Sequence, residues 1–592
     1  MTCKRSGGCW AAALSLAAAL LPAAAFAAKP CNLQALELPA TMVGARAVVT
    51  VGINGTQVPL ALDSGAFFSA LTPAAAQQLE LKLRRLPAGM RIYGLTGEIE
   101  SRVTTVKEMD LVGGKLPGID FLVGGNEPGA GTMGLLGRNI LGVTDAEYDL
   151  AHGVVRLIFP EGDCKGSQVA YWAKDQPLSE VDLLGLGSNN SAALLADARI
   201  NDRSITVLFD TGALSTISLA AARKAGVDKA DMQEMGRIHG AGEGSAQAWN
   251  AEFRRFQIGG ETISKILVEV ADYSDRDHDM LLGIDFFLSH RIYVSRGQRK
   301  MYFTYNGGPV FARSALELAK ARAPGTEAPA DAPPLADADA YARRGAAAAA
   351  RLDFPRALAD LDRACEMDPG VARHFLHRGT LRYRMNQAEA ARQDFDTALK
   401  LDPAQGDARL MRAELLAQAR EHQQALDDLQ TLDRTLPTQS PLRLDMAHLY
   451  ERLEQPDRAL AQWTHWIDAH RKDVHLPGAL NNRCWTRTLL NVELDEALTD
   501  CDQAVDLEPD KPSYRDSRGW LRLRRGELQK AQADFDQALK LKADHAWSLY
   551  GRGIVRARSG KPEQGQADLD AARKLLPSID AEVARLGLPA GT

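Results

Sequence analysis

Two stretches of the sequence, "LALDSGAFFSAL" at 60–71 and "VLFDTGALSTISL" at 207–219, place one carboxylate inside an apolar run that ends in a turn. The carboxylates are Asp63 and Asp210, which lie 147 positions apart. A buried ionised carboxylate is costly unless it is paired, hydrogen-bonded or neutralised. The recurrence of the same costly pattern indicates a duplicated unit in which the carboxylate has a function.

The surroundings of the two acids also match. Ile53 and Asn54 lie ten and nine residues before Asp63, and Ile200 and Asn201 lie at the same distances before Asp210. Further matches are "RIYGLTGE" (91–98) with "RIHGAGEG" (237–244), and "GLLGRNIL" (134–141) with "MLLGIDFF" (280–287). The short β-branched runs and the Asn54–Gly55 turn signal are typical of antiparallel strands joined by tight hairpins. The first half of the chain is therefore predicted to be a duplicated β-domain.

Length and composition exclude several classes of protein. The chain has 592 residues, 45% of them hydrophobic and 25% charged, which is typical of several globular domains. Its 70 basic and 76 acidic residues give a net charge of -6, so no basic surface for nucleic acid is expected. We therefore expect no nucleic-acid partner.

The N-terminus has the features of an export signal. Lys4 and Arg5 precede an Ala-rich apolar run that ends in small residues near Ala27 and Ala28. This pattern predicts a secretory signal peptide over residues 1–28 and a periplasmic or secreted location in a bacterium. The alternative, a membrane anchor, is disfavoured because the run is short and is interrupted by Pro22. No later stretch is long enough to span a bilayer, so no stable membrane anchor is expected.

The second half of the chain has a different period. A Pro/Ala-rich segment over 309–338 reads as a linker. Beyond it, small residues recur at multiples of 34 positions, with an insertion of four residues before the last two: Gly345, Gly379, Ala413, Ala447, Gly519 and Gly553. This pattern resembles the tetratricopeptide repeat, and it predicts seven helix pairs over 339–577 followed by a tail at 578–592. The resemblance implies an all-α solenoid that binds a protein partner in its groove.

Five cysteines follow the signal segment, and in an oxidising compartment some of them should pair. In the fifth repeat, Trp485 is assigned to the small-residue position, and Cys484 and Cys501 are expected to face each other between the two helices. We predict a disulfide there, with two buried thiols as the alternative. Cys31 and Cys164 bracket the first lobe and are a weaker candidate pair, and Cys365 is expected to be free.

The acid motifs identify a family. Asp63-Ser64-Gly65-Ala66 and Asp210-Thr211-Gly212-Ala213, each followed 74 or 73 residues after the acid by a glycine in an apolar run, resemble the active-site motifs of aspartic peptidases of the retropepsin type. The resemblance implies two all-β lobes, over 29–162 and 163–308, fused as in the pseudo-dimer of pepsin. The predicted fold class is thus two retropepsin-like β-lobes followed by the all-α solenoid.

The resemblance also implies a role for each residue type. Asp63 and Asp210 would share one proton and activate a water molecule, without a metal, a cofactor or a covalent intermediate. The hydroxyls of Ser64 and Thr211 would bond across the lobe interface. Four glycines would allow close backbone approach around the acids: Gly65, Gly212, Gly137 and Gly283.

Two glycine-rich hairpins resemble the flaps that close over a bound peptide. The residues to follow at their tips are Tyr93, Gly94, His239 and Gly240. For both Tyr93 and His239, the sequence favours the alternative that they are solvent-exposed hairpin residues.

Two other motifs are weaker. Gly129, Gly131 and Gly134 satisfy G-x-G-x-x-G, but no strand-to-helix unit surrounds them, which argues against a dinucleotide site. A second cluster could bind a cation or could be a polar turn before an apolar strand, and its sequence favours the turn; it comprises Asp275, Asp277, His278 and Asp279.

The function that these features favour is an exported aspartic endopeptidase, acting on a peptide or protein substrate, with a repeat domain for protein interaction. One alternative is a non-catalytic adaptor that binds peptides on a protease-like fold. Another is a protein whose lobes pair between chains, although a monomer is expected.

Overall fold

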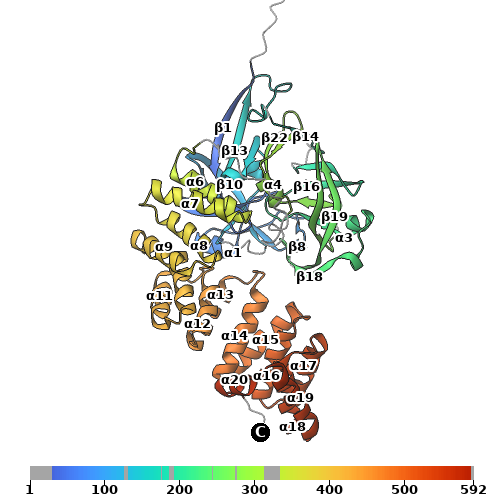
Figure 1. The fold of residues 1–592 in the computed structure, drawn as a ribbon, viewed down its shortest axis with the longest axis vertical. Coiled ribbons are helices and arrows are strands. Elements are labelled where there is room, and N and C mark those ends of the chain that lie inside the picture. The colour runs from blue at the N-terminus through green and yellow to red at the C-terminus, as the bar shows by residue number, and fades with distance from the viewer. Residues whose placement is uncertain are drawn as a thin grey trace, which may run out of the picture.

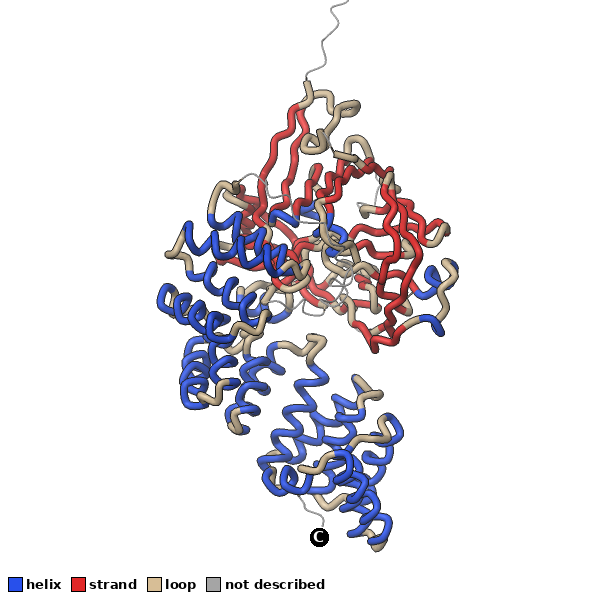
Figure 2. The backbone as a smooth tube through the Cα atoms, in the orientation of Figure 1, coloured by secondary structure: helices blue, strands red, loops and turns tan. Residues whose placement is uncertain are grey.

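The computed structural model of the chain describes residues 30–125, 131–174, 176–185, 193–242, 244–273, 277–311 and 334–588. The predicted signal segment, most of the linker, Gly129 and Asp275 lie outside these residues. Strands make up the first half of the described chain and helices the second half (Figures 1 and 2). In both views the β-rich half is at the top, and the helices descend along one side of it and then turn beneath it.

Lobe 1 is a sheet that closes on itself, because β9 pairs with both β10 and β3. The ring consists, in order, of β3 (Arg46–Ile53), β4 (Thr56–Leu62), β11 (Gly134–Leu136), β5 (Ala70–Leu71), β10 (Gly114–Gly124) and β9 (Ser101–Leu111). Two short strands, β2 (Thr41–Val43) and β6 (Arg84–Arg85), extend it. Along β3, the alternate residues Ala47, Val49 and Val51 are buried, as expected for a strand with one face on a core.

Lobe 2 repeats this ring. Its strands are, in order, β15 (Leu195–Ile200), β16 (Arg203–Phe209), β21 (Met280–Leu282), β17 (Thr216–Ser218), β20 (Glu261–Ala271) and β19 (Ala246–Ile258), with β18 (Gln233–Ile238) added beside β19. Short helices follow matching strands in the two lobes: α1 (Pro73–Gln78) and α2 (Arg138–Leu141) in lobe 1, α3 (Leu219–Lys224) and α4 (Ile284–Ser289) in lobe 2. Thr72 and Ser218 cap α1 and α3 through their side-chain oxygens.

A third sheet joins the lobes. Its six strands are, in order, β1 (Asn32–Pro39), β13 (Val154–Glu161), β12 (Asp145–Asp149), β22 (His290–Ser295), β23 (Lys300–Tyr305) and β14 (Ser179–Asp182). The pairing of β12 with β22 carries the sheet from one lobe to the other. The buried carboxylate of Glu147 accepts hydrogen bonds from Arg156 at 2.6 Å, from Arg291 at 2.9 Å and from Tyr171 at 2.6 Å, so an ion pair between lobes accompanies the backbone pairing.

The helical half is an array of helix pairs. Residues 334–588 form α6 (Ala338–Ala350), α7 (Phe354–Met367), α8 (Ala372–Arg384), α9 (Ala388–Leu401), α10 (Gly406–Gln418), α11 (His422–Thr435), α12 (Arg443–Arg452), α13 (Pro456–Ala469), α14 (Leu476–Leu490), α15 (Leu494–Leu507), α16 (Pro512–Arg524), α17 (Leu528–Leu541), α18 (Ala546–Arg558), α19 (Pro562–Leu575) and α20 (Ile579–Arg585). Helices α6 to α19 make seven consecutive pairs. None of the described helices is long and apolar enough to cross a membrane.

Each helix pair packs a small residue against a large one. A Cβ atom on Gly379 would lie 2.7 Å from the ring of Phe395, and one on Gly553 would lie 2.8 Å from Leu569. Such a distance is too short for any side chain, so glycine sets the spacing of the two helices.

An arginine on the first helix also pairs with a buried aspartate on the second in most units, for example Arg378 with Asp394 at 2.7 Å. In the fourth unit, Met446 and Gln462 take the places of this pair, so its two helices lack the charged link.

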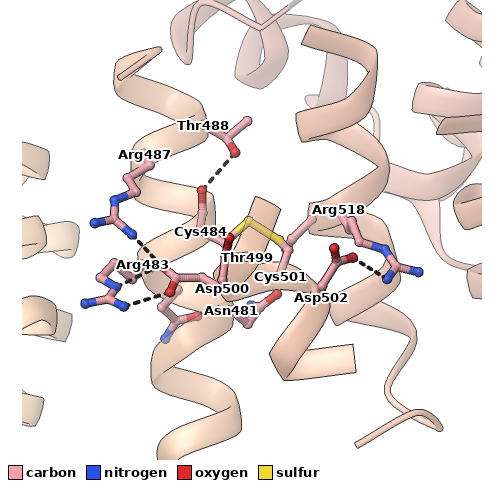
Figure 3. Close-up of a disulfide and its surroundings, with 12 residues drawn as sticks. Asn481, Arg483, Cys484, Arg487, Thr488, Thr499, Asp500, Cys501, Asp502 and Arg518 are labelled. Carbon is pink, nitrogen blue, oxygen red and sulfur yellow. Dashed lines mark hydrogen bonds and ion pairs between the residues drawn. A yellow bond between two sulfur atoms is a disulfide. The ribbon is translucent and has the colours of Figure 1, made fainter. Parts of the chain in front are cut away.

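The fifth unit corrects one sequence prediction. Trp485 does not occupy the small-residue position; Cys484 does, and it is bonded to Cys501 of the facing helix (Figure 3). The error arose because this pair has one additional residue between its two packing positions: Arg483 and Asp500 pair at a separation of 17, whereas Arg378 and Asp394 pair at a separation of 16. The disulfide thus takes the place of the contact between a glycine or alanine and a large apolar side chain that the other units use.

The array is not held to the lobes by the linker alone. In α6, Ala347 is part of the hydrophobic core of the lobes. Arg351 of the same region donates hydrogen bonds to the carbonyls of Leu288 and Gly307 at 3.4 and 3.2 Å. The first helix of the array is therefore packed against the β-domain.

Candidate active site

The two acids follow equivalent strands. Asp63 follows β4 and Asp210 follows β16, and each of these strands runs parallel to a short strand, β11 or β21. The amide of Asp63 donates to the carbonyl of Leu136, and that of Asp210 to Leu282, both at 3.0 Å. The parallel pairing is thus continued by one residue, which fixes the place where each acid leaves its sheet.

Hydrogen bonds cross between the two acid loops. The amide of Ser64 donates to Oγ1 of Thr211, and the amide of Thr211 donates to Oγ of Ser64, both at 3.0 Å. Oγ of Ser64 also donates to the carbonyl of Phe209 at 2.9 Å. Because these groups are buried, the bonds hold the two loops in register about a pseudo-two-fold axis, and the two lobes pair within one chain.

Each carboxyl group lies against the glycine of the opposite lobe. The Ala66 amide donates to Oδ1 of Asp63 at 2.7 Å, and the Gly212 amide donates to Oδ1 of Asp210 at 2.8 Å. A Cβ atom on Gly65 would lie 2.4 Å from Cγ of Asp210, and one on Gly212 would lie 2.6 Å from Cγ of Asp63. Only glycine fits at these two positions, and its absence of a side chain lets the carboxyl groups approach each other.

The carboxyl groups titrate as a pair. Burial, followed by the neighbouring charge of Asp63, raises the pKa of Asp210 well above its usual range. Burial also raises the pKa of Asp63, while hydrogen bonds from the Ala66 amide and from the Asp210 carboxyl group oppose the rise. The two carboxyl groups therefore share one proton between them.

The remaining two glycines lie beneath the loops. A Cβ atom on Gly137 would come within 2.6 Å of the Phe68 carbonyl, and one on Gly283 within 2.4 Å of Leu214. The amide of Gly137 donates to Oγ of Ser69 at 2.9 Å. The structure thus places Gly65, Gly212, Gly137 and Gly283 around the acids, whereas their catalytic roles stay predictions.

Two serine pairs were missed by the sequence analysis. Ser69 donates to Asn139 at 2.7 Å, and Ser215 donates to Asp285 at 2.6 Å, so each acid loop is tied to the helix below it. The signal in the sequence was the matched spacing of Ser69 to Gly137 and of Ser215 to Gly283, which is 68 residues in both lobes.

Two arginines near the acids were also missed. Arg46 donates through Nη1 to the carbonyl of Gly212 at 3.2 Å, and Arg138 donates through Nε to the carbonyl of Ala66 at 3.3 Å. Both guanidinium groups are attracted by Asp63 and Asp210. Isolated arginines in a sequence carry no such signal, because only the paired lobes bring Arg46 to the second acid loop.

The two predicted flaps meet at their tips. In lobe 1, β7 (Ile92–Gly94) and β8 (Gly97–Ile99) form a hairpin, and in lobe 2 the turn between β18 and β19 has the equivalent place. Thr96 Oγ1 donates to the carbonyl of Gly242 at 3.2 Å, and the Gly244 amide donates to the carbonyl of Thr96 at 2.9 Å. The hairpins are thus closed over each other.

The flap residues singled out from the sequence have different surroundings. Gly94 lies where a Cβ atom would overlap the carbonyl of Ala241, so a side chain there would force the tips apart. The Gly240 amide donates to Oγ1 of Thr96 at 3.3 Å. Tyr93 is 63% exposed, and Nε2 of His239 lies 3.6 Å from a carboxylate oxygen of Glu508 in the helical array.

A second contact also joins a flap to the array. Nζ of Lys472, in the turn between α13 and α14, lies 3.3 Å from Glu100, which follows the lobe 1 hairpin. Each flap therefore touches a turn of the array, one through His239 and the other through Glu100.

A pocket of about 230 Å³ opens beside the first acid loop. It is lined by Phe68, Arg84, Arg85, Pro87, Met90, Val103, Asp120, Phe121 and Leu122. Most of this lining is apolar, which suits a side chain of a bound peptide. In the described parts of the chain, no group of three or more His, Cys, Asp or Glu side chains is placed to hold a metal ion.

Both predicted cysteine pairs are bonded in the structure, Cys31 with Cys164 and Cys484 with Cys501. Cys365 is buried and has no disulfide partner.

Comparison with known families agrees with the repeated acid loop. The Aspartyl protease family matches residues 49–140 and again residues 196–286, and a Tetratricopeptide repeat family matches residues 345–416. Among curated proteins, no sequence matches the chain significantly.

Several solved structures resemble the helical half. One is a tetratricopeptide repeat protein from Parabacteroides merdae, with 18% identity and a TM-score of 0.32, which covers 42% of this chain and 98% of its own. Another is YrrB, a tetratricopeptide repeat protein described as having an unusual peptide-binding site, with 18% identity, a TM-score of 0.24 and coverage of 38% and 98%. A third is the Cut9–Hcn1 assembly of the APC/C, with 17% identity, a TM-score of 0.30 and coverage of 42% and 53%.

The family matches coincide with the two closed rings and with the start of the helix pairs. The chain therefore carries two closed β-lobes that match the Aspartyl protease family and pair as a pseudo-dimer, followed by an array of helix pairs that matches the Tetratricopeptide repeat family at its start.

Proposed function

We propose that the protein is an aspartic endopeptidase that hydrolyses peptide bonds with a water molecule activated by Asp63 and Asp210. The observation that carries this proposal is the pair of carboxyl groups, held face to face by the bonds between Ser64 and Thr211 and sharing one proton. Burying two carboxyl groups side by side costs folding free energy. Such costly pairs are expected at the active site of an enzyme.

We assign different roles to the two acids. Asp63, as the ionised member, accepts a proton from the water molecule, and Asp210 donates a hydrogen bond to the carbonyl oxygen of the peptide. Because the water molecule attacks the peptide carbonyl directly, no covalent intermediate forms between the enzyme and the peptide. The closed hairpins would have to open for a peptide to enter and would exclude bulk water after they close.

The helical array supports a second role in recognition of proteins. Arrays of this kind present continuous surfaces that bind other proteins. Because turns of this array contact both flaps through Glu508 and Lys472, a protein bound to it would lie near the entrance to the cleft. We propose that the array recruits protein substrates or partners.

Export is also part of the proposal. The N-terminal pattern of a signal peptide and two disulfides, Cys31–Cys164 and Cys484–Cys501, fit a periplasmic or secreted protein. The test is fractionation of cells that express the full chain, together with N-terminal sequencing of the mature form. A full-length protein retained in the cytoplasm would contradict export.

Peptidase activity is tested by incubating the purified mature protein with a mixed peptide library from acid to neutral pH. Cleavage that a pepstatin-like inhibitor blocks, and that Asp63→Asn abolishes, is expected. Peptides that bind tightly to a folded protein but stay intact at every pH would instead favour the alternative, a peptide-binding adaptor.

A further inference from the structure

One guanidinium group reaches from lobe 1 to the acid loop of lobe 2. Arg46 is the first residue of β3, and its Nη1 donates to the carbonyl of Gly212 at 3.2 Å. The position in lobe 2 that matches Arg46 is Ala193, whose side chain cannot make the same bond in the opposite direction. This link between a strand of one lobe and the acid loop of the other is therefore made from lobe 1.

The residue that Arg46 binds contacts both acids. The amide of Gly212 donates to Oδ1 of Asp210 at 2.8 Å, and a Cβ atom on Gly212 would lie 2.6 Å from Cγ of Asp63. Arg46 is half-buried, and its hydrogen bond fixes Nη1 against this glycine. The position of the positive charge relative to the two carboxyl groups is therefore fixed as well.

The charge of Arg46 acts on both acids. Burial lowers the pKa of the guanidinium group, while the charges of Asp63 and Asp210 oppose this change. In turn, burial raises the pKa of Asp63, and the charge of Arg46 is among the influences that oppose the rise. A cation beside a carboxyl group favours its ionised form. Arg46 therefore favours the loss of a proton from the acid pair.

Other charged side chains also lie around the acid loops. Arg138 begins α2 and Asp285 lies in α4, so the helices below the two loops carry opposite charges. Arg296 is close enough to Arg138 to lower its pKa, and the Arg296 amide donates to Oδ1 of Asp145 at 2.8 Å. Among these described groups, Arg46 alone joins the acid loop of one lobe to a strand of the other.

The proposed reaction needs the acid pair in one protonation state. A pair with two protons has no carboxylate to accept a proton from water, and a pair with none has no hydrogen-bond donor for the peptide carbonyl. A nearby cation stabilises negative charge in both steps, so it moves both proton losses to lower pH. A fixed cation therefore sets the pH range in which the pair holds one proton.

We propose that Arg46 is a positioning residue whose bond to Gly212 holds a positive charge beside the acid pair and thereby keeps the pair singly ionised in acidic solution. The inference rests on the proposed peptidase function and adds the pH range of that site. It also makes the lobes unequal, since lobe 1 supplies this charge for both acids.

The test compares Arg46→Gln with Arg46→Lys, which keeps the charge, in the pH profile of kcat/KM on a peptide without titratable side chains. This profile reports the ionisation of the free enzyme. Loss of the charge should move both limbs to higher pH. Arg46→Gln should thus be about fivefold less active on the acid limb and about fivefold more active on the alkaline limb. Arg46→Lys should follow the unmodified protein on both limbs.

Arg203→Gln is the matched control, because it removes the same charge at an exposed position at the far end of β16 from Asp210. It should leave both limbs in place. Arg46→Met, which keeps the aliphatic stem, replaces Arg46→Gln if circular dichroism shows that the Gln variant does not fold. A loss by the same factor at every pH, or an equal shift of the limbs in Arg46→Lys, would overturn the inference, because the arginine would then only support the loop.

Labelling with a small epoxide separates the inference from the proposed function. An ionised carboxylate opens the epoxide ring and forms an ester, the ring oxygen takes a proton from water, and mass spectrometry locates the ester on Asp63 or Asp210. Labelling that begins at higher pH in Arg46→Gln, in a protein that cleaves no peptide at any pH, would support the inference and overturn the peptidase. Peptide cleavage with unchanged limbs and unchanged labelling in Arg46→Gln would overturn the inference and leave the peptidase intact.

Discussion

Lobe 1 and lobe 2 anchor their acids by equivalent backbone bonds, from the amides of Asp63 and Asp210 to Leu136 and Leu282, but the loop after the acid is one residue longer in lobe 1. Ser69 lies six residues after Asp63, whereas Ser215 lies five residues after Asp210. The additional residue makes the pair Phe67–Phe68 where lobe 2 has Leu214 alone, and Phe67 is 48% exposed. The bonds from the serines to Gly137 and Gly283 are nevertheless the same, so the insertion changes the wall of the cleft and not the support of the acid.

The remaining differences have the same character. Lobe 1 has Arg46 and Arg138 at positions where lobe 2 has uncharged residues, and the Cys31–Cys164 disulfide joins the beginning of lobe 1 to the segment that begins lobe 2. The residues that bring the two carboxyl groups together are duplicated, and other residues around the acid loops have diverged. The comparison teaches that the two lobes support the acid pair in similar ways and differ in the residues around it.

The largest effect is expected when the equivalence of the acids is broken. Asp63→Asn and Asp210→Asn should each lower kcat/KM on a peptide by about three orders of magnitude or more, because the pair acts as one unit. The double variant should be no less active than either single variant. Steady-state kinetics measures this, and circular dichroism shows whether each variant folds. A folded Asp63→Asn protein with near-normal activity would show that the lobes are not equivalent.

The next effect comes from the glycines that face the opposite acid. Gly65→Ala and Gly212→Ala each add a Cβ atom within 2.7 Å of the other lobe's carboxyl carbon, so each should lower kcat/KM by about 100-fold through misplacement of the pair. Gly297→Ala is the matched control, since a Cβ atom there meets nothing within 4 Å. Similar losses for Gly65→Ala and Gly212→Ala are expected. A normal kcat/KM in either variant would show that the two glycines do not support the acid pair equally.

The cross-lobe hydroxyls should differ in their contributions. Ser64→Ala removes two buried hydrogen bonds and leaves the Thr211 amide unsatisfied, so it should lower the free energy of unfolding by about 2–3 kcal/mol. Thr211→Ala removes the acceptor of the Ser64 amide and should cost about 1–2 kcal/mol. Urea denaturation measures both values, with Ser64→Thr as a conservative control. Equal losses would mean that the two hydroxyls serve the interface alike.

A smaller effect concerns stability and pH. The raised pKa of Asp210 means that the folded state holds this proton more tightly than the unfolded chain does. Its contribution to stability is therefore fully present below about pH 4, the usual range of an aspartate, and falls as pH rises through the folded-state pKa. Asp210→Asn should have a higher Tm than the unmodified protein at pH 7 and an equal Tm near pH 3.

Asp197→Asn, an exposed change in the same lobe, is the control for thermal unfolding and should leave the Tm unchanged at both pH values. A Tm of Asp210→Asn that is lower at pH 7 would contradict the shared proton.

The smallest effect is expected where the array touches the flaps. Lys472→Ala and His239→Ala each remove one exposed or half-exposed ion pair, so each should change kcat/KM on a short peptide by less than about twofold. The assay uses only the short peptide, because a protein substrate would also contact the array under the proposed function. A tenfold change on the peptide would show that the array controls flap opening.

Much of the β-domain could be predicted from the sequence, because the duplication repeats the acid motif and its surroundings at matching spacings. The spacing from acid to glycine, the Ile–Asn pairs and the glycine-rich hairpins predicted two β-lobes, each with one acid loop and one flap-like hairpin, whereas the order of the strands came from the structure. The seven helix pairs followed from the 34-residue period. Trp485 is the exception: one additional residue between the packing positions of the fifth pair shifts the register, and the contact between Cys484 and Cys501 shows where the true position lies.

By itself, the sequence determined the two lobes, the repeats and the identity of the acids, because these depend on local patterns that recur along the chain. The tertiary structure alone decided which residues of one lobe reach the other. Arg46 contacts Gly212, Gly65 lies against Asp210, and β12 pairs with β22 across the lobes. Such contacts join positions more than 140 residues apart, and no local pattern encodes them, because they depend on how two complete cores pack together.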